Sequence, residues 1–575
     1  MSPSIRTLPP ETIALIAAGE VIDSLAAVVR ELVENALDAG ANRITVSLIP
    51  ELWWLQVTDN GKGMSLEDLE ICASPHSTSK ICDRQDLWQI KSLGFRGEAL
   101  HSIAQVADLE ILSRPRIPKD EIGWRVTYLS GEVITKEVVA IAPGTIVTVA
   151  NLFGKMPVRR RGLPNLPQQL KSVQSVIQNL ALCHPQVTWQ IKQNQKLWFQ
   201  ISPGMNPQKI LPQILPRVNL SDLQYLKLDL NTPNGENCAD IDKKKANNLP
   251  PTQLELIMGL PDRCHRHRAD WVKVAVNGRI VHLPELEHTM IKGMARTLPR
   301  DRYPLSFLHL HTASTQVDWN RHPAKTEIYL HSLPYWQEQV DRAIAQILRL
   351  NTETLPDAVG DRRIGKLLKV AEKQNKYQLE TDNSVQTVKS SQEISLIPLK
   401  AVAQVNKTYI VAEHPSGMWL VEQHIAHERV IYEQLQDDWQ LIALETPIIL
   451  NNLTSTQLEQ LKRLELEIEP FGEGLWAVRN APAILAERED CTDALIELSY
   501  GGNLQSAQVA TACRSAIRNG TPLELPEMQN LLDRWKVTRN PRTCPHGRPI
   551  YLSLEESALA RFFRRHWVIG KSHGI

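Results

Sequence analysis

The chain has no overall charge bias. Among its 575 residues, 64 are Lys or Arg and 64 are Asp or Glu, so the formal net charge is zero. A balanced chain is not drawn as a whole to nucleic acid, so any such contact must come from local basic patches. Three clusters are candidates, although each is by itself more typical of a solvated surface: Arg159-Arg160-Arg161, Arg296 with Arg300 and Arg302, and Arg561 with Arg564 and Arg565.

The sequence also lacks the marks of an exported or membrane protein. Its eight cysteines are scattered without a Cys-x-x-Cys pair, which argues against a disulfide framework. The N-terminus has no cleavable apolar segment, and no apolar run approaches the roughly 20 residues that span a bilayer. We therefore expect a soluble, cytoplasmic protein without a membrane partner. A Walker-type glycine-lysine loop is absent too, so a nucleotide site would have to be of another kind.

A chain of this length should form several domains. Residues 1–205 mix helical periodicity with strand patterns such as 43–49 and 145–151, and predict an α/β sandwich. Residues 206–350 restart the pattern, with strands at 271–276 and 305–311 and helical periodicity at 286–298 and 335–350. Residues 351–394 are polar and predict a flexible linker, while 231–252 predict a loop. Residues 395–575 regain apolar periodicity, so the predicted fold class is α/β (α+β) in four parts.

One predicted helix carries a distinctive polar face. In residues 25–40 the apolar side chains recur every three or four residues, which indicates an amphipathic helix. Glu31, Asn35 and Asp38 are at positions i, i+4 and i+7, so they share one face. A carboxylate one turn before an amide suits the polarisation of water and the binding of a divalent cation. Gly40 can supply the left-handed residue that ends the helix.

Glycine-rich loops follow this helix. Residues 53–58 predict a strand that runs into Asp59-Asn60-Gly61-Lys62-Gly63, where Asp59 can accept a hydrogen bond from an exocyclic amine. Farther on, Gly94-Phe95-Arg96-Gly97 precedes a second helical pattern, whose first N–H groups would form a phosphate site. The ordered set of helix carboxylate, Asp-Asn-Gly loop and glycine-rich segment favours a nucleotide site.

A second group of chemically active residues lies near the C-terminus. His424 and Glu428 are four apart on a predicted helix, a spacing that suits two ligands of one metal. Cys513, Cys544 and His546 follow downstream, and such a donor set favours Zn²⁺, although Mn²⁺ could share the carboxylates. An exposed helix with His and Glu needs no metal, so the spacing alone leaves both readings open. The pattern is not that of a zinc protease, which disfavours a peptidase.

These motifs resemble those of the MutL mismatch-repair proteins, within the gyrase, heat-shock chaperone, histidine kinase and MutL superfamily of ATPases. The similar segments are residues 16–21, the Glu-Leu-Val-Glu-Asn-Ala-Leu-Asp-Ala-Gly helix at 31–40, Gly-Phe-Arg-Gly-Glu-Ala-Leu at 94–100 and His322-Pro323-Ala324-Lys325. The resemblance implies a Bergerat-type ATPase sandwich (1–205), a transducer subdomain (206–350), a flexible linker (351–394) and a C-terminal dimerisation and endonuclease domain (395–575).

The resemblance also implies roles in ATP binding and hydrolysis. Glu31 would be the general base, Asn35 would coordinate Mg²⁺, and Asp59 would recognise the adenine amine. Lys325 would reach the γ-phosphate from the second subdomain. The remaining residues expected to bind ATP are Gly61, Gly63, Thr78, Ser79, Lys80, Gly94, Phe95, Arg96, Gly97 and Thr145.

The chain departs from the family pattern in two places. Residues 154–158 differ from the usual loop before Arg159-Arg160, which alters the expected loop contacts. In the endonuclease motif of the family, Glu422 replaces an aspartate and Ile425 an alanine, whereas His424, Glu428, Cys513, Cys544 and His546 are kept as expected metal ligands. Glu428 would be catalytic, and the substitutions leave open whether the nuclease is active.

The function implied is that of an ATP-gated DNA clamp that couples mismatch recognition to nicking of one strand. The expected partners are mismatched duplex DNA, a MutS-family protein and a second copy of the chain, in a bacterium in association with the nucleoid. Residues 392–398 fit a sliding-clamp peptide only loosely. The main alternative is an ATP-dependent matchmaker without nuclease activity. A chaperone or topoisomerase subunit would leave the C-terminal cysteines and histidines unexplained, and a histidine kinase would need a phosphoacceptor helix before the ATP site.

Overall fold

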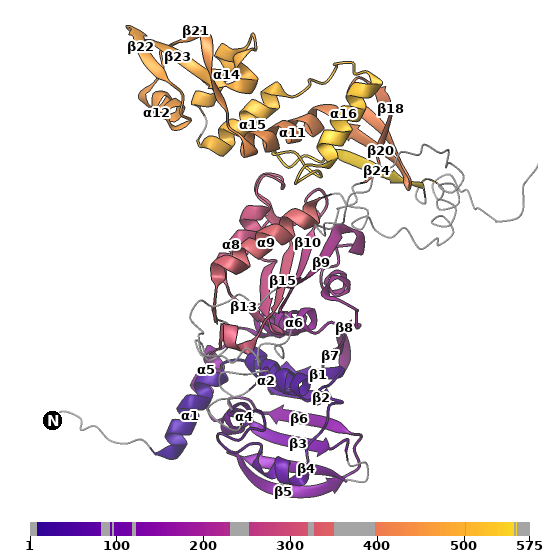
Figure 1. Cartoon of the computed structure of the whole chain (residues 1–575). Helices are drawn as coiled ribbons and strands as arrows, with labels where there is room; N and C mark the ends of the chain where they lie inside the picture. The colour runs from indigo at the N-terminus through magenta and orange to yellow at the C-terminus, as the bar shows by residue number, and fades with distance from the viewer. Residues whose placement is uncertain are drawn as a thin grey trace, which may run out of the picture. The chain divides into compact units, whose positions relative to one another are not determined.

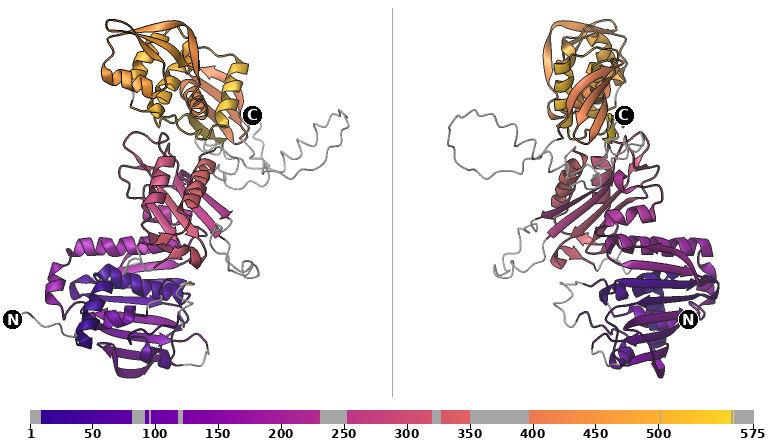
Figure 2. Two further views of the ribbon diagram at one scale, coloured as in Figure 1. Left: turned by 60° about the vertical axis from the view of Figure 1, so that its left-hand side comes forward. Right: turned by 90° about the vertical axis from the view of Figure 1, so that its right-hand side faces the viewer.

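The computed structural model describes residues 9–81, 92–94, 97–117, 122–230, 252–319, 327–349, 397–500, 502–556 and 559. The chain divides into two compact units. The first comprises Met1–Gly259, Asp270–Met290 and Leu305–Asp341, and the second comprises Leu260–Ala269, Ile291–Pro304 and Arg342–Ile575. Figures 1 and 2 show both units. The predicted linker and most of the predicted 231–252 loop lie outside the described residues, and the four-part division stays a prediction.

An eight-stranded sheet with the order β5-β4-β3-β6-β2-β1-β7-β8 forms the first part of unit 1. All neighbouring strands are antiparallel except β1 and β7, which are parallel. The strands are β1 (Arg43–Ile49), β2 (Trp54–Asp59), β3 (Asp108–Arg114), β4 (Gly123–Leu129), β5 (Glu132–Val139), β6 (Gly144–Ala150), β7 (Thr188–Gln193) and β8 (Lys196–Ile201).

Helices cover one face of this sheet (Figure 1). Alternation along β2 turns Leu55, Val57 and Asp59 toward the helices, whereas Gln56 on the other face donates a hydrogen bond to Thr148. Asp59 is therefore directed at the helical layer by strand geometry. The helices of this part are α1 (Pro10–Val21), α2 (Leu25–Asp38), α3 (Leu66–Ile71), α4 (Ala99–Val106), α5 (Pro157–Gly162), α6 (Leu166–Cys183) and α7 (Leu211–Ile214).

A five-stranded sheet with the order β13-β12-β15-β10-β9 forms the second part of unit 1. Its strands are β9 (Leu223–Leu230), β10 (Thr252–Gly259), β12 (Val272–Val276), β13 (Arg279–Val281) and β15 (Ser306–His311). Figure 1 shows α8 (Pro284–Gly293) and α9 (Leu333–Leu348) beside this sheet. Their buried residues include Leu286, Met290, Trp336 and Val340. Strands β12 and β15 agree to within one residue with the strands predicted at 271–276 and 305–311. Helix α8 ends at Gly293, five residues before the end of the predicted helix at 286–298. The short strands β16 (Val317–Asp318) and β17 (Tyr329–Leu330) pair with each other.

The C-terminal part of unit 2 has two sheets. The first, β18-β19-β20-β24, packs with helices α11 and α16 around Trp419, Trp535 and Tyr551, where Trp419 and Tyr551 stack at 4.4 Å. The second, β21-β23-β22, packs with helices α12 and α14. The elements are β18 (Lys400–Val405), β19 (Tyr409–His414), β20 (Gly417–Glu422), α11 (Gln423–Asp437), β21 (Leu441–Asn451), α12 (Ser455–Arg463), β22 (Ile468–Gly472), β23 (Leu475–Pro482), α13 (Ala483–Ala486), α14 (Cys491–Ser499), α15 (Leu504–Ser515), α16 (Leu525–Lys536) and β24 (Tyr551–Glu555), with the short pair β11 (His265–Arg266) and β14 (Tyr303–Pro304) elsewhere in the unit.

No described helix is by itself long and apolar enough to cross a membrane. Residues 12–21 and 25–38 reach that length and composition only when joined, and these two helices are bent by 84° at the break between them.

Candidate functional sites

Helix α2 is fixed at both ends, which sets the direction of its polar face. The Ser24 hydroxyl accepts a hydrogen bond from the Ala27 N–H at 3.2 Å and caps the first turn. At the other end, Gly40 has φ +74° and its N–H bonds to Leu37 O, while Ala41 N–H bonds to Ala36 O. These two bonds are those of a Schellman motif, in agreement with the predicted glycine stop.

The polar face of α2 borders a cavity of about 690 Å³. This volume lies within the range of small-molecule and cofactor sites. The residues predicted to bind nucleotide that line it are Glu31, Asn35, Asp59, Gly63, Thr78, Ser79, Lys80, Gly94, Gly97 and Thr145. Gly61 does not line it but contacts Asp59, while Phe95, Arg96 and Lys325 lie outside the described residues.

Asp59 lies at the end of β2 in a partly buried position. Its carboxylate Oδ1 accepts a hydrogen bond from the Gly61 N–H at 2.7 Å. Burial raises the pKa of Asp59 to about 6, although the N–H groups of Gly61 and Thr145 oppose this shift. Thr145 on β6 is itself held by a 2.9 Å contact between its hydroxyl and that of Ser113. The carboxylate is therefore positioned as an acceptor in an apolar wall.

The loop after Asp59 requires glycine for steric reasons. Gly63 has φ +72°, and a Cβ added there would lie 2.0 Å from the carbonyl oxygen of Arg114. No side chain is tolerated at that distance, and L-residues rarely adopt that backbone conformation. The close approach of the two backbones keeps this rim of the cavity in place.

A hydrogen-bond network links α2 to the Leu93-Gly94 segment. The Lys80 ammonium donates to Asn35 Oδ1 at 2.8 Å and to Asp38 Oδ2 at 2.6 Å. Asp38 also accepts from the N–H groups of Leu93 at 2.8 Å and Gly94 at 3.0 Å. The sequence placed Asp38 on the polar face but assigned it no role. Its signal was the i+7 spacing from Glu31, and the structure makes it the centre of the network.

Glu31 lies at the wall of the cavity with a side chain that is 12% exposed. The only charged group within ion-pair distance of it among the described residues is Arg30, whose Nε is 3.5 Å away. A long contact of this kind adds little energy. The carboxylate is therefore available to accept a proton from a molecule in the cavity.

The double arginine after the altered loop contacts its own surroundings. Arg159 Nη2 donates to the Gly19 carbonyl at 2.5 Å. The Arg160 guanidinium lies 4.6 Å from the ring centroid of Trp53 and donates to Asn151 at 3.2 Å. These contacts hold α5 against the sandwich, so only Arg161 of this basic cluster is directed mainly to solvent.

Three of the predicted metal ligands come together in unit 2. Suitable ligand atoms of Glu428, Cys544 and His546 lie within 4.8 Å of one another. Glu428 and Cys544 are fully buried, and His546 is partly buried. Glu428 Oε1 is 2.8 Å from His546 Nδ1, but their orientation is poor for a hydrogen bond, and neither atom has another such partner among the described side chains. A carboxylate, a thiol and an imidazole whose ligand atoms lie this close together fit a metal site.

The charges of this cluster balance one another. Burial would raise the pKa of Glu428, but His546 and Arg548, whose Nη2 is 3.0 Å from Glu428 Oε2, outweigh it and lower the pKa. A similar competition acts on the Cys544 thiol: burial would raise its pKa, but hydrogen bonds from His546 and Arg548 together outweigh burial and lower the pKa. Contact with Cys544, and next with Glu428, raises the pKa of His546 to about 9.

His424 and Cys513 are outside this compact group. His424 Nδ1 is 2.9 Å from the Ile517 carbonyl, which leaves Nε2 as its other ring donor atom. Burial, followed by the negative charge of Glu428, raises the pKa of Cys513 on α15. Both residues are therefore near the cluster without forming part of it.

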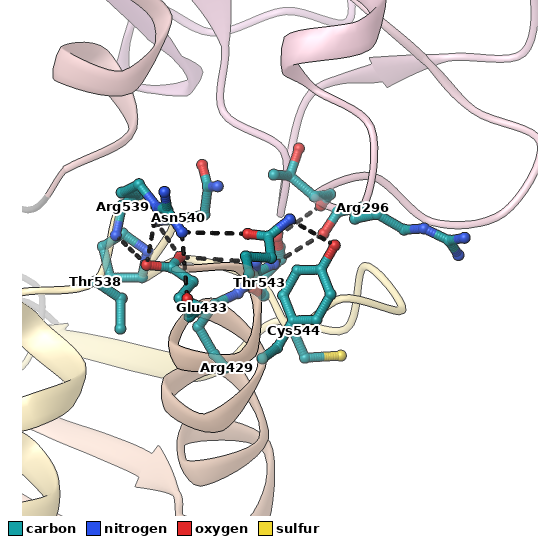
Figure 3. A network of polar contacts seen from close by, with 12 residues as sticks. Arg296, Arg429, Glu433, Thr538, Arg539, Asn540, Thr543 and Cys544 are labelled. Atoms are coloured by element: carbon teal, nitrogen blue, oxygen red, sulfur yellow. Dashed lines mark hydrogen bonds and ion pairs between the residues drawn. The ribbon is translucent and has the colours of Figure 1, made fainter. Parts of the chain in front are cut away.

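The loop that bears Cys544 is held by the same helix that bears Glu428. Figure 3 shows Glu433 of α11 facing this loop, where its carboxylate accepts from the N–H groups of Arg539 at 2.6 Å and Asn540 at 3.0 Å. Arg429, also fully buried, donates to the Thr543 carbonyl at 2.8 Å. Glu433 and Arg429 thus position Cys544 opposite Glu428.

The two departures in the motif have structural roles. Glu422 is the N-cap of α11, where its carboxylate accepts from the Ile425 N–H at 2.5 Å and from Asn519 Nδ2 at 2.6 Å. Ile425 packs against the apolar core of Trp419 and Trp535. Neither side chain belongs to the Glu428–Cys544–His546 group.

Three protein families match successive parts of the chain. Residues 23–148 match the histidine kinase-, DNA gyrase B-, and HSP90-like ATPases, residues 230–349 match the DNA mismatch repair protein C-terminal domain, and residues 402–523 match the MutL C-terminal dimerisation domain.

Curated relatives match over the whole length. The DNA mismatch repair protein MutL of Rippkaea orientalis is 62% identical over 576 residues, with 100% of both chains covered. The protein of the same name from Nostoc sp. is 60% identical over 577 residues, again with 100% of both covered. That of Methanoculleus marisnigri is 32% identical and covers 98% of this chain and 99% of its own. Among solved structures, the N-terminal domain of a DNA repair protein aligns with a TM-score of 0.47 and 22% identity, over 58% of this chain and 97% of that one.

Proposed function

The chain belongs to the MutL family of DNA mismatch repair proteins, and we propose that it acts as a homodimeric, ATP-gated clamp on DNA that couples mismatch recognition to nicking of one strand. The ATPase domain and the dimerisation domain support the two ends of this mechanism. The observation that carries the proposal is the cavity in which a helix carboxylate, an amide and a partly buried aspartate surround one space.

ATP would bind with its adenine amine against Asp59 and its phosphates beneath Gly94 and Gly97. The raised pKa of Asp59, about 6, still leaves the carboxylate ionised at neutral pH. Glu31 would take the proton from the water that attacks the γ-phosphorus, as the bond to ADP breaks. In phosphoryl transfer of this kind, positioning and charge neutralisation supply most of the catalysis.

Asn35 would hold Mg²⁺, which when bound neutralises phosphate charge. In the described structure the Lys80 ammonium contacts Asn35 Oδ1, so this atom already faces a positive charge. Exchange of the ammonium for the metal would free Lys80 to contact a phosphate. Lys325 would report on the γ-phosphate from the second subdomain.

The clamp would require two copies of the chain. The C-terminal halves would keep the dimer together through the domain at 402–523, while the ATPase halves would close around duplex DNA when ATP binds. The partner that brings the clamp to a mismatch would be a MutS-family protein. Binding to a sliding clamp rests only on residues 392–398, most of which lie outside the described structure.

Nicking would take place at the Glu428–Cys544–His546 cluster. These residues would hold Zn²⁺ or Mn²⁺, with His424 and Cys513 as further ligands, and the metal would stabilise negative charge on the attacked phosphate. Glu428 Oε1 is buried, makes no hydrogen bond among the described residues and lies 2.8 Å from His546 Nδ1, which supports this assignment. Arg429 and Glu433 would keep the Cys544 loop in register with Glu428.

One observation favours the alternative of a matchmaker without nuclease activity. Arg548 lies 3.0 Å from Glu428 Oε2, and its positive charge competes with any metal for that oxygen. In this alternative the cluster is an ion-pair network that holds the loop, and other nucleases cut the DNA.

Titration calorimetry tests the ATP site. The full chain should release heat on binding a non-hydrolysable ATP analogue with Mg²⁺, whereas Asp59→Asn should bind far more weakly because the amide presents an N–H donor to the adenine amine. Absence of heat with the unchanged chain would overturn the proposal. Elemental analysis of the purified chain tests the second site, where about one Zn²⁺ or Mn²⁺ per chain is expected, and none after Cys544→Ser with His546→Ala.

A further inference from the structure

The turn between β12 and β13, together with Arg279 at the start of β13, contacts β15, the end of α6, helix α2 and Leu93. Asn277 and Gly278 have φ +47° and +86°, the signature of a type I′ hairpin turn. The Asn277 N–H bonds to Leu310 O at 2.9 Å, and its side chain exchanges two hydrogen bonds with the backbone of Thr312. The turn is thereby fixed to the end of β15.

The buried His309 and the partly buried His184 hold the peptide groups of Gly278. The Gly278 N–H donates to His309 Nε2 at 3.0 Å, and the Gly278 carbonyl lies 3.0 Å from His184 Nε2. Burial lowers the pKa of both histidines, that of His309 well below its usual value. Neutral His309 can accept the N–H, as this geometry requires. His184 directly follows α6, which packs against α2.

Arg279, the next residue, reaches α2 itself. It is 7% exposed, and its Nε donates to Glu34 Oε1 at 3.2 Å while its Nη2 donates to Oε2 of the same carboxylate. Glu34 is 2% exposed and lies on the helix that carries Glu31. A bidentate pair buried on both sides fixes direction as well as distance. The Arg279 guanidinium also lies 5.4 Å from the ring centroid of Trp319.

The same guanidinium contacts the segment that borders the cavity. Arg279 Nη2 donates to the Leu93 carbonyl at 2.7 Å, while Asp38 of α2 accepts from the Leu93 N–H at 2.8 Å. The N–H of Leu93 is therefore bound by Asp38 of α2, and its carbonyl is bound by Arg279 of the five-stranded sheet. Gly94, which lines the cavity, follows directly and bonds to the same Asp38.

We propose that Arg279 is a positioning residue for ATP hydrolysis, which through Glu34 and the Leu93 carbonyl ties the Leu93-Gly94 segment beside the cavity to the second sheet. The link is separate from Lys325, because it acts through the backbone of the segment and not through the γ-phosphate. Through this link the position of Gly94 depends on the β12–β13 hairpin, and the position of the hairpin depends on Gly94. The inference rests on the proposed ATP site.

The test compares the full chain with the double variant Glu34→Met and Arg279→Met. Replacement of both partners by apolar side chains removes both charges of this buried pair together, so the fold should be retained. We expect kcat for ATP to fall about tenfold or more, the size expected for a lost hydrogen bond to a charged group, with KM changed by less than about threefold. Glu110→Met with Arg125→Met is the matched control, since this pair is exposed on the same sandwich.

Amide hydrogen exchange supplies a readout that a merely structural role would not move. In the unchanged chain, a non-hydrolysable ATP analogue should slow exchange both at Leu93-Gly94 and in the hairpin at 272–281. In the double variant the slowing should remain at the first site and disappear at the second. Unchanged kcat, or unchanged protection of the hairpin in a folded variant, would overturn the inference.

A single substitution at Arg279 and the binding of the ATP analogue by the unchanged chain complete the test. If the double variant does not fold, Arg279→Lys replaces it, because lysine keeps the charge opposite Glu34 but lacks the planar fork that also reaches Leu93 O. We expect kcat to fall about threefold or more with KM unchanged, and an unchanged kcat would contradict the inference. Failure of the unchanged chain to bind the analogue would instead reject the proposed ATP site.

Discussion

Glu31 in the cavity beside α2 and Glu428 in the Glu428–Cys544–His546 cluster differ in how far neighbouring groups neutralise their charge. In the cavity of about 690 Å³, Glu31 has only a 3.5 Å contact with Arg30, and the space before it is open. In the cluster, Glu428 is fully buried and already contacts His546 at 2.8 Å and Arg548 at 3.0 Å. Among the described residues, only the long contact with Arg30 offsets the charge of Glu31. The cluster neutralises itself, so a metal must displace a positive charge that is already there.

The largest expected effect breaks the first half of this comparison. Glu31→Ala should lower ATP turnover by about 10²- to 10⁴-fold, the contribution typical of a general base, because the attacking water loses its proton acceptor. Binding of a non-hydrolysable ATP analogue should change little. Steady-state hydrolysis measures the first quantity and calorimetry the second. Glu137→Ala, an exposed carboxylate on β5, is the control, and turnover of Glu31→Ala at the control rate would remove Glu31 from its role.

The next effect concerns the second site. Glu428→Lys and His546→Ala should each reduce nicking of supercoiled plasmid in Mn²⁺ by about tenfold or more, because each removes one donor atom of the cluster. Gel quantification of nicked circles measures the rate. Glu459→Lys, on the exposed face of α12, should nick like the unchanged chain. Equal nicking by all four proteins would mean that this cluster is not the nuclease site, and absence of nicking from the unchanged chain would favour the matchmaker.

A change of pH sharpens the account of the first site. The pKa of Asp59 is raised from 3.8 to about 6, so the carboxylate is ionised at pH 7 and mostly protonated at pH 5. Affinity for the ATP analogue should therefore fall about tenfold between these pH values. Because this folded-state pKa is raised, ionisation of Asp59 reduces stability as pH rises from about 4 to 6, so its protonation is no cause of unfolding at pH 5. An affinity independent of pH would show that the adenine is read by another group.

The smallest effect tests whether Glu422 is structural. Glu422→Ala should lower the free energy of unfolding by about 1 kcal/mol, the typical value of an N-cap, because the Ile425 N–H loses its acceptor. Glu422→Asp should lose less, since aspartate is a good cap. Urea unfolding measures both. Plasmid nicking should be retained in both variants, and its complete loss in a folded Glu422→Asp protein would place this carboxylate in the chemistry.

Local sequence patterns predicted the elements that carry the ATP site well. The face of α2 follows from 3.6-residue periodicity, its C-terminal stop from Gly40, and the direction of Asp59 from strand alternation. These features depend on neighbours within a few residues, so no distant contact is needed to read them. Local pattern failed for α8, whose apolar periodicity continues to residue 298 although the helix ends at Gly293.

Contacts between residues far apart in the sequence could not be predicted from local patterns. Glu34 is 245 residues from Arg279, and on the sequence it is one more charge on a helix whose other polar residues face a ligand. Asp38 shared the predicted face, yet its bonds to Leu93 and Gly94 depend on how a segment 55 residues away returns to the helix. At the other site, Glu422 reads as an altered ligand, and only the position of Asn519 and the start of α11 reveal a cap.

The amino-acid sequence by itself determined which side chains share a face and where each helix can start and stop, because backbone geometry repeats with fixed periods. The tertiary structure alone decided which carboxylate accepts which donor. Long-range partners are selected when burial removes water and each charged group must find a counterpart in the packed interior, and no local period encodes that choice.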